Sequence, residues 1–137
     1  MLKSVKVADY MTRQLITFTV DTPLFDAIKT FSEHQVSGAP VINQDNQLVG
    51  VLSEVDCLRG ILDKTYHEAE VGGTVGEFMT QKIDTVSGAT DIIAVAEQFI
   101  HRGRRRIPVV EDGKLVGQVS RKDILRAVND FICKDCD

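Results

Sequence analysis

An internal repeat organises the chain and limits the folds that it can adopt. The segment VADYMTRQLITFTVDTPLFDAIKTF begins at Val7 and returns as VGEFMTQKIDTVSGATDIIAVAEQF, which begins at Val75. The match continues through a Pro-Val pair, a Leu-Val-Gly triplet and the motif S-x-x-D-x-L-R. One residue is lost between the Pro-Val and Leu-Val-Gly motifs, as expected where two copies of a folded unit differ in a turn. In a chain of 137 residues, this periodicity predicts two copies of one small supersecondary unit.

Each copy predicts the element order β-α-β-β-α. Thr22 and Pro23 are typical of a helix start, with Thr22 as N-cap and Pro23 as the first helical residue. Apolar residues then recur at helical spacing. Two short apolar runs follow, joined by the polar turns NQDNQ and EDGK, and predict a β-hairpin in each copy. A second helix comes after each hairpin.

The fold class is therefore α/β (α+β), built from tandem β-α-β-β-α repeats. We expect repeat 1 at 7–62, a linker at 63–74, repeat 2 at 75–130 and a C-terminal tail at 131–137. A repeat of about 55 residues buries little surface by itself. We therefore expect the two repeats to pack together about a pseudo-twofold axis.

Composition narrows the possible partners. Hydrophobic residues make up 43% and charged residues 26% of the chain, which is an ordinary globular mixture. A net charge of −4 argues against a nucleic-acid partner. The sequence has no apolar run of the roughly 18 residues that a membrane span needs, and its N-terminal stretch lacks the apolar core of a signal peptide. We expect no membrane partner and a cytoplasmic location.

The most informative motif lies where each hairpin enters its last helix. It reads GVLSEVD from Gly50 and GQVSRKD from Gly117. One interpretation is a capping box, in which Ser caps the helix and Asp three residues later reaches back to it. The other is ligand binding, since a helix N-terminus attracts phosphate and a carboxylate can accept hydrogen bonds from ribose hydroxyls. The two roles are compatible, because a hydroxyl both donates and accepts.

The order of these motifs, present twice at matching spacing, resembles the CBS domain pair, or Bateman module, from about Val7 to Asp130. The resemblance rests on Asp9-Tyr10-Met11-Thr12 and its counterpart at 77–80, on the Pro-Val pairs and on G-x-h-S-x-x-D. It implies a stand-alone, non-catalytic regulatory module. Its ligand would be an adenine nucleotide (AMP, ADP or ATP) or a related adenosyl compound in the cleft between the repeats.

The resemblance also implies which residues hold that ligand. Ser and Asp of the motif would contact phosphate and ribose, and adenine would lie between the segment after Met-Thr and the residue before the hairpin Pro. The better site would comprise Ser120, Asp123, Arg121, Lys122, Ile83, Asp84, Thr85, Ile107 and Arg106. The second, weaker site would comprise Ser53, Asp56, Leu15, Ile16, Thr17 and Ala39.

Charge decides this ranking. Two cations, Arg121 and Lys122, follow Ser120, whereas Glu54 follows Ser53 and repels an anion. Asp84 departs from the apolar residue expected beside adenine: it either accepts a hydrogen bond from the exocyclic amine or weakens binding. The basic run 102–106 is either a solvated strand entrance or a phosphate clamp.

The remaining polar residues predict neither catalysis nor a metal site. Cys133 and Cys136 have C-x-x-C spacing, but a zinc site needs four ligands, and a frayed tail is the favoured interpretation. Cys57 replaces Ile124 of the other repeat and is expected to be a buried packing residue. The sequence offers no nucleophile and base pair, so we expect neither an enzyme nor a required cofactor.

Two functions stay open on the sequence alone. The first is a regulatory nucleotide-binding module that acts through an effector protein, which the sequence does not identify. The second is a structural dimerisation module with empty clefts. A homodimer through the helices is implied by the resemblance, and Ile93 and Ile100 add an apolar face beside the stripe of Ile92, Ala96 and Phe99.

Overall fold

A computed structural model describes residues 1–66 and 73–135 in two compact units. Unit 1 combines Met1–Leu15 with Asp84–Asp137, and unit 2 is Ile16–Ile83. Half of the predicted linker at 63–74 (residues 67–72) and the last two residues of the tail lie outside the described residues.

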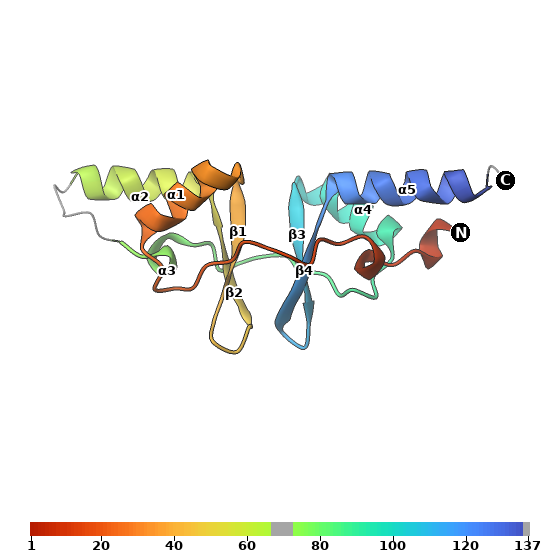
Figure 1. Ribbon diagram of the computed structural model, residues 1–137, viewed down its shortest axis with the longest axis horizontal. Coiled ribbons are helices and arrows are strands. Elements are labelled where there is room, and N and C mark those ends of the chain that lie inside the picture. The colour runs from red at the N-terminus through yellow and green to blue at the C-terminus, as the bar shows by residue number, and fades with distance from the viewer. Residues whose placement is uncertain (67–72, 136–137) are drawn as a thin grey trace. The chain divides into compact units, whose positions relative to one another are not determined.

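Unit 2 contains one β-hairpin and three helices (Figure 1). Its elements are α1 (Leu24–His34), β1 (Gly38–Ile42), β2 (Leu48–Ser53), α2 (Glu54–Tyr66) and α3 (Val75–Phe78). Unit 1 repeats this plan and opens with two 3-10 turns. Its elements are η1 (Leu2–Ser4), η2 (Val7–Asp9), α4 (Ile92–Arg102), β3 (Arg106–Glu111), β4 (Lys114–Ser120) and α5 (Arg121–Asp135). The predicted mixed fold of tandem repeats is confirmed.

The two hairpins share one register. Ala39 pairs with Leu52 in unit 2, and Ile107 pairs with Val119 in unit 1. Both sheets are antiparallel and two-stranded, and each has a register shift before its turn. The predicted opening strand of each repeat is reduced to a single parallel bridge, from Phe18 to Val41 and from the equivalent Val86 to Val109.

The compact units cut across the sequence repeats at their opening segments. Thr12 belongs to the first repeat but bridges Gln118 of β4, through backbone hydrogen bonds of 2.8 and 2.9 Å. Thr80 of the second repeat bridges Val51 of β2 through two bonds of 2.9 Å. Each hairpin is therefore completed by the Met-Thr segment that opens the other repeat. The predicted boundaries at 7–62 and 75–130 mark the duplication in the sequence, whereas the compact units have other boundaries.

Side chains fix the N-terminal segment to unit 1, where it lies beside α4 and α5 (Figure 1). The Tyr10 hydroxyl donates to Asp130 of α5 at 2.9 Å. The Arg126 guanidinium donates to the Tyr10 carbonyl at 2.8 Å and lies over the Tyr10 ring. These contacts anchor the N-terminal segment to the helix that ends the unit.

The expected start of α1 is wrong by one residue. Pro23, not Thr22, occupies the N-cap, and it has no side-chain cap. The Thr22 hydroxyl instead accepts from the backbone N–H of Thr19 at 3.1 Å. The N–H of Leu24 is satisfied by the carbonyl of Gly73 at 2.8 Å. A backbone partner distant in sequence thus replaces the cap that the local sequence suggested.

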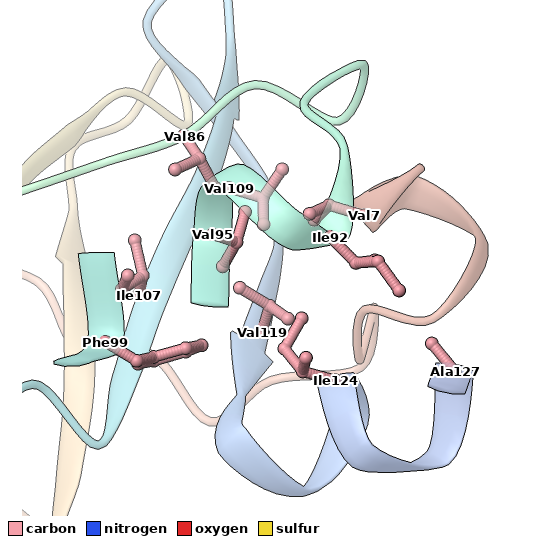
Figure 2. Close-up of a cluster of buried hydrophobic side chains, with 10 residues drawn as sticks. All are labelled: Val7, Val86, Ile92, Val95, Phe99, Ile107, Val109, Val119, Ile124 and Ala127. Carbon is pink, nitrogen blue, oxygen red and sulfur yellow. The ribbon is translucent and has the colours of Figure 1, made fainter. Parts of the chain in front are cut away.

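Each unit has its own buried apolar cluster. Ten buried side chains form the cluster of unit 1, which joins the N-terminal segment to α4, both strands and α5 (Figure 2). The cluster of unit 2 has nine members, and Val75 of α3 is one of them. Burying a large aliphatic side chain stabilises a fold by about 1.5–3 kcal/mol. The exchanged segments therefore contribute substantially to the core that they join.

Gly117 lies where the exchanged segment approaches β4 most closely. A Cβ at this position would lie 2.6 Å from the Met11 sulfur and 2.9 Å from the carbonyl oxygen of Thr12. We expect Gly117→Ala to lower the free energy of unfolding by about 1–3 kcal/mol, because backbone has to shift. Hydrogen exchange at Thr12 and Gln118 should also become faster.

Gly103→Ala is the matched control for Gly117→Ala. Gly103 has a φ of 62° and no atom within 4 Å of the new methyl group, so its substitution should cost about 1 kcal/mol through backbone strain alone. Urea denaturation and amide exchange compare the two variants. Unchanged exchange at the Thr12–Gln118 bridge in Gly117→Ala would show that the glycine does not hold the segment.

Candidate functional site

The start of α2 in unit 2 carries a complete capping box. The Ser53 hydroxyl accepts from the N–H of Asp56 at 3.2 Å and donates to the Asp56 carboxylate at 3.0 Å. The same carboxylate accepts from the Ser53 N–H at 2.9 Å. The β2 strand ends at Ser53 and α2 begins at the next residue, so strand and helix together place this pair. The predicted cap is confirmed here.

The start of α5 in unit 1 repeats this arrangement. The Ser120 hydroxyl accepts from the Asp123 N–H at 3.3 Å and donates to the carboxylate at 3.1 Å. The Ser120 N–H donates to the same carboxylate at 2.8 Å. Both helices exceed ten residues, so each start has a developed positive dipole end.

The two carboxylates differ in what surrounds them. Asp56 is 3% exposed and also accepts from the Thr80 hydroxyl at 3.3 and 3.4 Å. Asp123 is 9% exposed. Thr12, the counterpart of Thr80, makes no hydrogen bond to it within the described part of the chain. Asp123 therefore keeps more acceptor capacity for a ligand.

The charges at the two helix starts differ as the sequence predicted. Arg121 and Lys122 are exposed in the first turn of α5, whereas Glu54 is exposed in the first turn of α2. Neither cation forms an ion pair with any described residue. Arg106 lies across the hairpin from Ser120 in the β3–β4 register. Unit 1 therefore places three cationic residues around one helix N-terminus.

Other predicted site residues lie in different settings. Ile107 and Ala39 belong to the cores of units 1 and 2. Thr85 is exposed, and Leu15, Ile16, Thr17 and Ile83 are half-buried. Ile83 and Asp84 fall on opposite sides of the division between the units. The contacts of all these residues with a ligand stay predictions.

Asp84 has partners that the sequence did not reveal. One oxygen of its carboxylate accepts from Arg102. The other oxygen accepts from the Arg104 Nε at 3.1 Å. Two arginines of the basic run are therefore paired with a carboxylate from another segment. Arg105 is exposed. The basic run 102–106 is therefore not simply a solvated start of β3. It also does not offer all four of its arginines to a phosphate, because Asp84 pairs with two of them.

The cysteines have the settings of structural or peripheral residues. Cys57 is buried in the unit 2 core, as predicted, and burial raises the pKa of its thiol to about 11. Cys133 is exposed, and Cys136 lies outside the described residues. Across residues 1–66 and 73–135, no three His, Cys, Asp or Glu side chains gather as metal ligands would. The helices of these ranges include none with the length and apolar character of a membrane span.

Comparison with known proteins identifies the family. A model of the CBS domain matches residues 7–63 and 75–130. The chain belongs to the CBS domain family. Its two CBS domains follow each other directly, at the positions of the internal repeat. The twin serine–aspartate caps are thus features of a CBS domain pair.

Two relatives of this CBS domain pair come from an archaeon and a bacterium. The chain is 32% identical over 120 residues to the uncharacterized protein MJ1225 of Methanocaldococcus jannaschii, covering 88% of this chain and 41% of that protein. It is 33% identical over 129 residues to the A-adding tRNA nucleotidyltransferase of Aquifex aeolicus, covering 94% of this chain and 15% of the relative. The chain thus spans less than half the length of these two proteins.

A solved structure matches nearly the whole CBS domain pair. The crystal structure of CBSX2 in complex with AMP has a TM-score of 0.80 and 32% sequence identity, covering 93% of this chain and 98% of that one. CBSX2 is a CBS-pair protein from Arabidopsis thaliana. This chain therefore shares its fold with CBSX2, a CBS-pair protein that was crystallised with AMP.

Proposed function

We propose that this CBS domain pair is a non-catalytic regulatory module that binds an adenine nucleotide or a related adenosyl ligand. The observation that carries the proposal is the Ser-Asp cap at the start of α5, with Arg121 and Lys122 in the same turn. A helix N-terminus with added cations favours phosphate. The carboxylate of Asp123 retains lone pairs for ribose hydroxyls.

The AMP complex of CBSX2 supports the choice of ligand class, because that protein shares this fold at 32% identity. In the same proposal, unit 1 holds the stronger site through Ser120, Asp123, Arg121, Lys122 and Arg106, with Asp84 and Thr85 beside them. Unit 2 holds the weaker site through Ser53 and Asp56. Binding would alter the contacts of the module with an effector protein.

A calorimetric titration of the full chain with AMP, ADP and ATP tests this function. We expect at least one of them to bind with a dissociation constant below the millimolar range. NMR shifts should be largest at the amides of Ser120 to Asp123. If none binds at millimolar concentration, the caps serve only the helices and the nucleotide function is wrong.

The second candidate function is a dimerisation module, and exposed apolar residues on one helix of each unit favour self-association. Val55, Leu58 and Leu62 are exposed at spacings of three and four residues on α2, so they form one stripe along the helix. Leu125 and Ile132 are exposed seven residues apart on α5. Exposed apolar stripes of this kind mark contact surfaces. A homodimer is therefore part of the proposal and is compatible with ligand binding.

We expect the unmodified chain to form a dimer of about twice 15.2 kDa and Leu58→Asp to be a monomer, because a charge would be buried without a partner at the contact. Ile100→Asp tests instead the face that the sequence predicted at Ile93 and Ile100: Ile100 is 79% exposed on α4, but Ile93 is half-buried and no exposed large apolar residue lies one turn away among the described residues, so this variant should stay dimeric. Light scattering at tens of micromolar measures the mass. A monomeric unmodified chain would rule out the dimer. If Ile100→Asp dissociated it and Leu58→Asp did not, the contact would lie on α4 and not on α2.

A further inference from the structure

One cluster of charged side chains occurs in unit 1 and is absent from its counterpart in unit 2, among the residues that the structure describes. Asp84, Arg102 and Arg104 come from separate segments, and the carboxylate joins the two arginines. The residues 68 positions earlier are Ile16, His34 and Val36. Ile16 and Val36 pack against the core of unit 2. The two units therefore differ here in chemistry, at equivalent places.

The helices that precede the cluster and its counterpart end in the same way. Gly103 ends α4 with a φ of 62°, and Gln35 ends α1 with a φ of 53°. Both residues are left-handed helix caps, which turn the chain back from the helix. The turn brings Arg104 to Asp84 in unit 1, and it brings Val36 to the core that Ile16 also contacts in unit 2. The same kind of turn therefore leads to an ion-pair cluster in unit 1 and to an apolar contact in unit 2.

The cluster fixes the carboxylate of Asp84. The Asp84 side chain is 20% exposed, whereas those of Arg102 and Arg104 are 56% and 51% exposed. Each carboxylate oxygen accepts from one arginine, and each has a second lone pair. The arginines therefore hold this carboxylate in one position. A ligand that donates to it does not have to order the side chain first.

The position of Asp84 relates it to the start of α5. Val86 bridges Val109 in parallel, so Asp84, two residues earlier, flanks the end of β3 at which Arg106 lies. On the other side of that end, Arg106 pairs with Ser120. Asp84 and Ser120 therefore flank the same strand end from opposite sides. A nucleotide held at the α5 N-terminus that extends across this strand end arrives at Asp84.

We propose that Asp84 is a specificity-determining residue of the unit 1 site, which selects a purine with a 6-amino group over one with a 6-oxo group. The proposal rests on the proposed nucleotide function. A carboxylate accepts from the 6-amino group of adenine, and it repels the 6-oxo group that hypoxanthine carries at the same place. Unit 2 has Ile16 at this position and makes no such distinction.

AMP and IMP are the two probes that test this selectivity, since they share phosphate and ribose. In calorimetry on the full chain, with Ser120 and Thr85 amide shifts marking unit 1, AMP should bind about ten- to a hundredfold more tightly than IMP. In Asp84→Asn the two affinities should come within about threefold, because an amide also donates to a carbonyl oxygen. Asp84→Ile, which installs the residue of the first repeat, should likewise abolish the preference.

Glu97→Gln is the matched control. It removes one negative charge from α4 without touching the cluster, so the preference for AMP should be unchanged. Equal binding of AMP and IMP by the parent chain, or an unchanged preference in both Asp84 variants, overturns the selectivity and leaves nucleotide binding intact. Failure of both nucleotides to bind overturns the proposed function and the selectivity together.

Discussion

Residues 16–83 expressed alone should give a dispersed NMR spectrum and cooperative unfolding, whereas residues 1–70 should give neither. The two fragments are nearly equal in length, and both contain α1, the first hairpin and α2. Only the fragment 16–83 contains α3 and the Thr80 bridge to Val51.

The size of this difference follows from what residues 1–70 lack. Val75 is fully buried in unit 2, and Phe78 and Met79 pack against the same cluster. Full burial of Val75 contributes about 1.5–3 kcal/mol, and the partly buried Phe78 and Met79 add to it. Their combined loss is a large part of the stability of a small unit. Residues 1–15, which only the fragment 1–70 retains, have their partners in 84–137. Equal folding of the two fragments would show that the exchanged segments are dispensable.

The second large effect is that Asp123→Ala should weaken ligand binding more than Asp56→Ala, whereas Asp56→Ala should lower the stability more. Asp123→Ala should weaken AMP binding about ten- to a hundredfold, because a hydrogen bond to a charged group contributes about 1.5–3 kcal/mol. Asp56→Ala should weaken it much less. Isothermal calorimetry on the two variants makes the comparison.

Stability should follow the opposite order. Asp56 accepts from the Ser53 N–H and hydroxyl and from the Thr80 hydroxyl, so its removal should cost about 2–3 kcal/mol of unfolding free energy. Asp123 lacks the bond to a threonine, and its removal should cost about 1–2 kcal/mol. Urea denaturation measures this. Equal affinity losses would indicate two equivalent sites, and a loss confined to Asp56→Ala would show that local charge is the wrong guide.

Local patterns predicted the local structure of this chain well. The Ser53 and Ser120 caps join residues three positions apart, and each hairpin joins two consecutive strands through a short turn; the structure confirms both. Thr22 shows where local patterns fail. Its expected cap is replaced because Gly73, about fifty residues away, supplies a carbonyl to α1.

The pairing of Asp84 with Arg102 and Arg104 shows the same limit at the candidate site. No periodicity joins these positions, so Asp84 and the basic run read as separate features of the sequence. A signal was nonetheless present, because Ile16 and Val36 both become charged residues of opposite sign at 84 and 104. Comparing the repeats position by position for such paired changes would have suggested the contact.

The exchange of opening segments has a consequence for synthesis on the ribosome. Unit 2 is one continuous stretch, so all of it has been translated once residue 83 is made. Unit 1 is divided, and Val7, Tyr10 and Met11 leave the ribosome long before the strand and helix that they pack against. The segment 1–15 therefore finds its partners only after unit 2 has been made, and unit 2 should fold before unit 1 during synthesis.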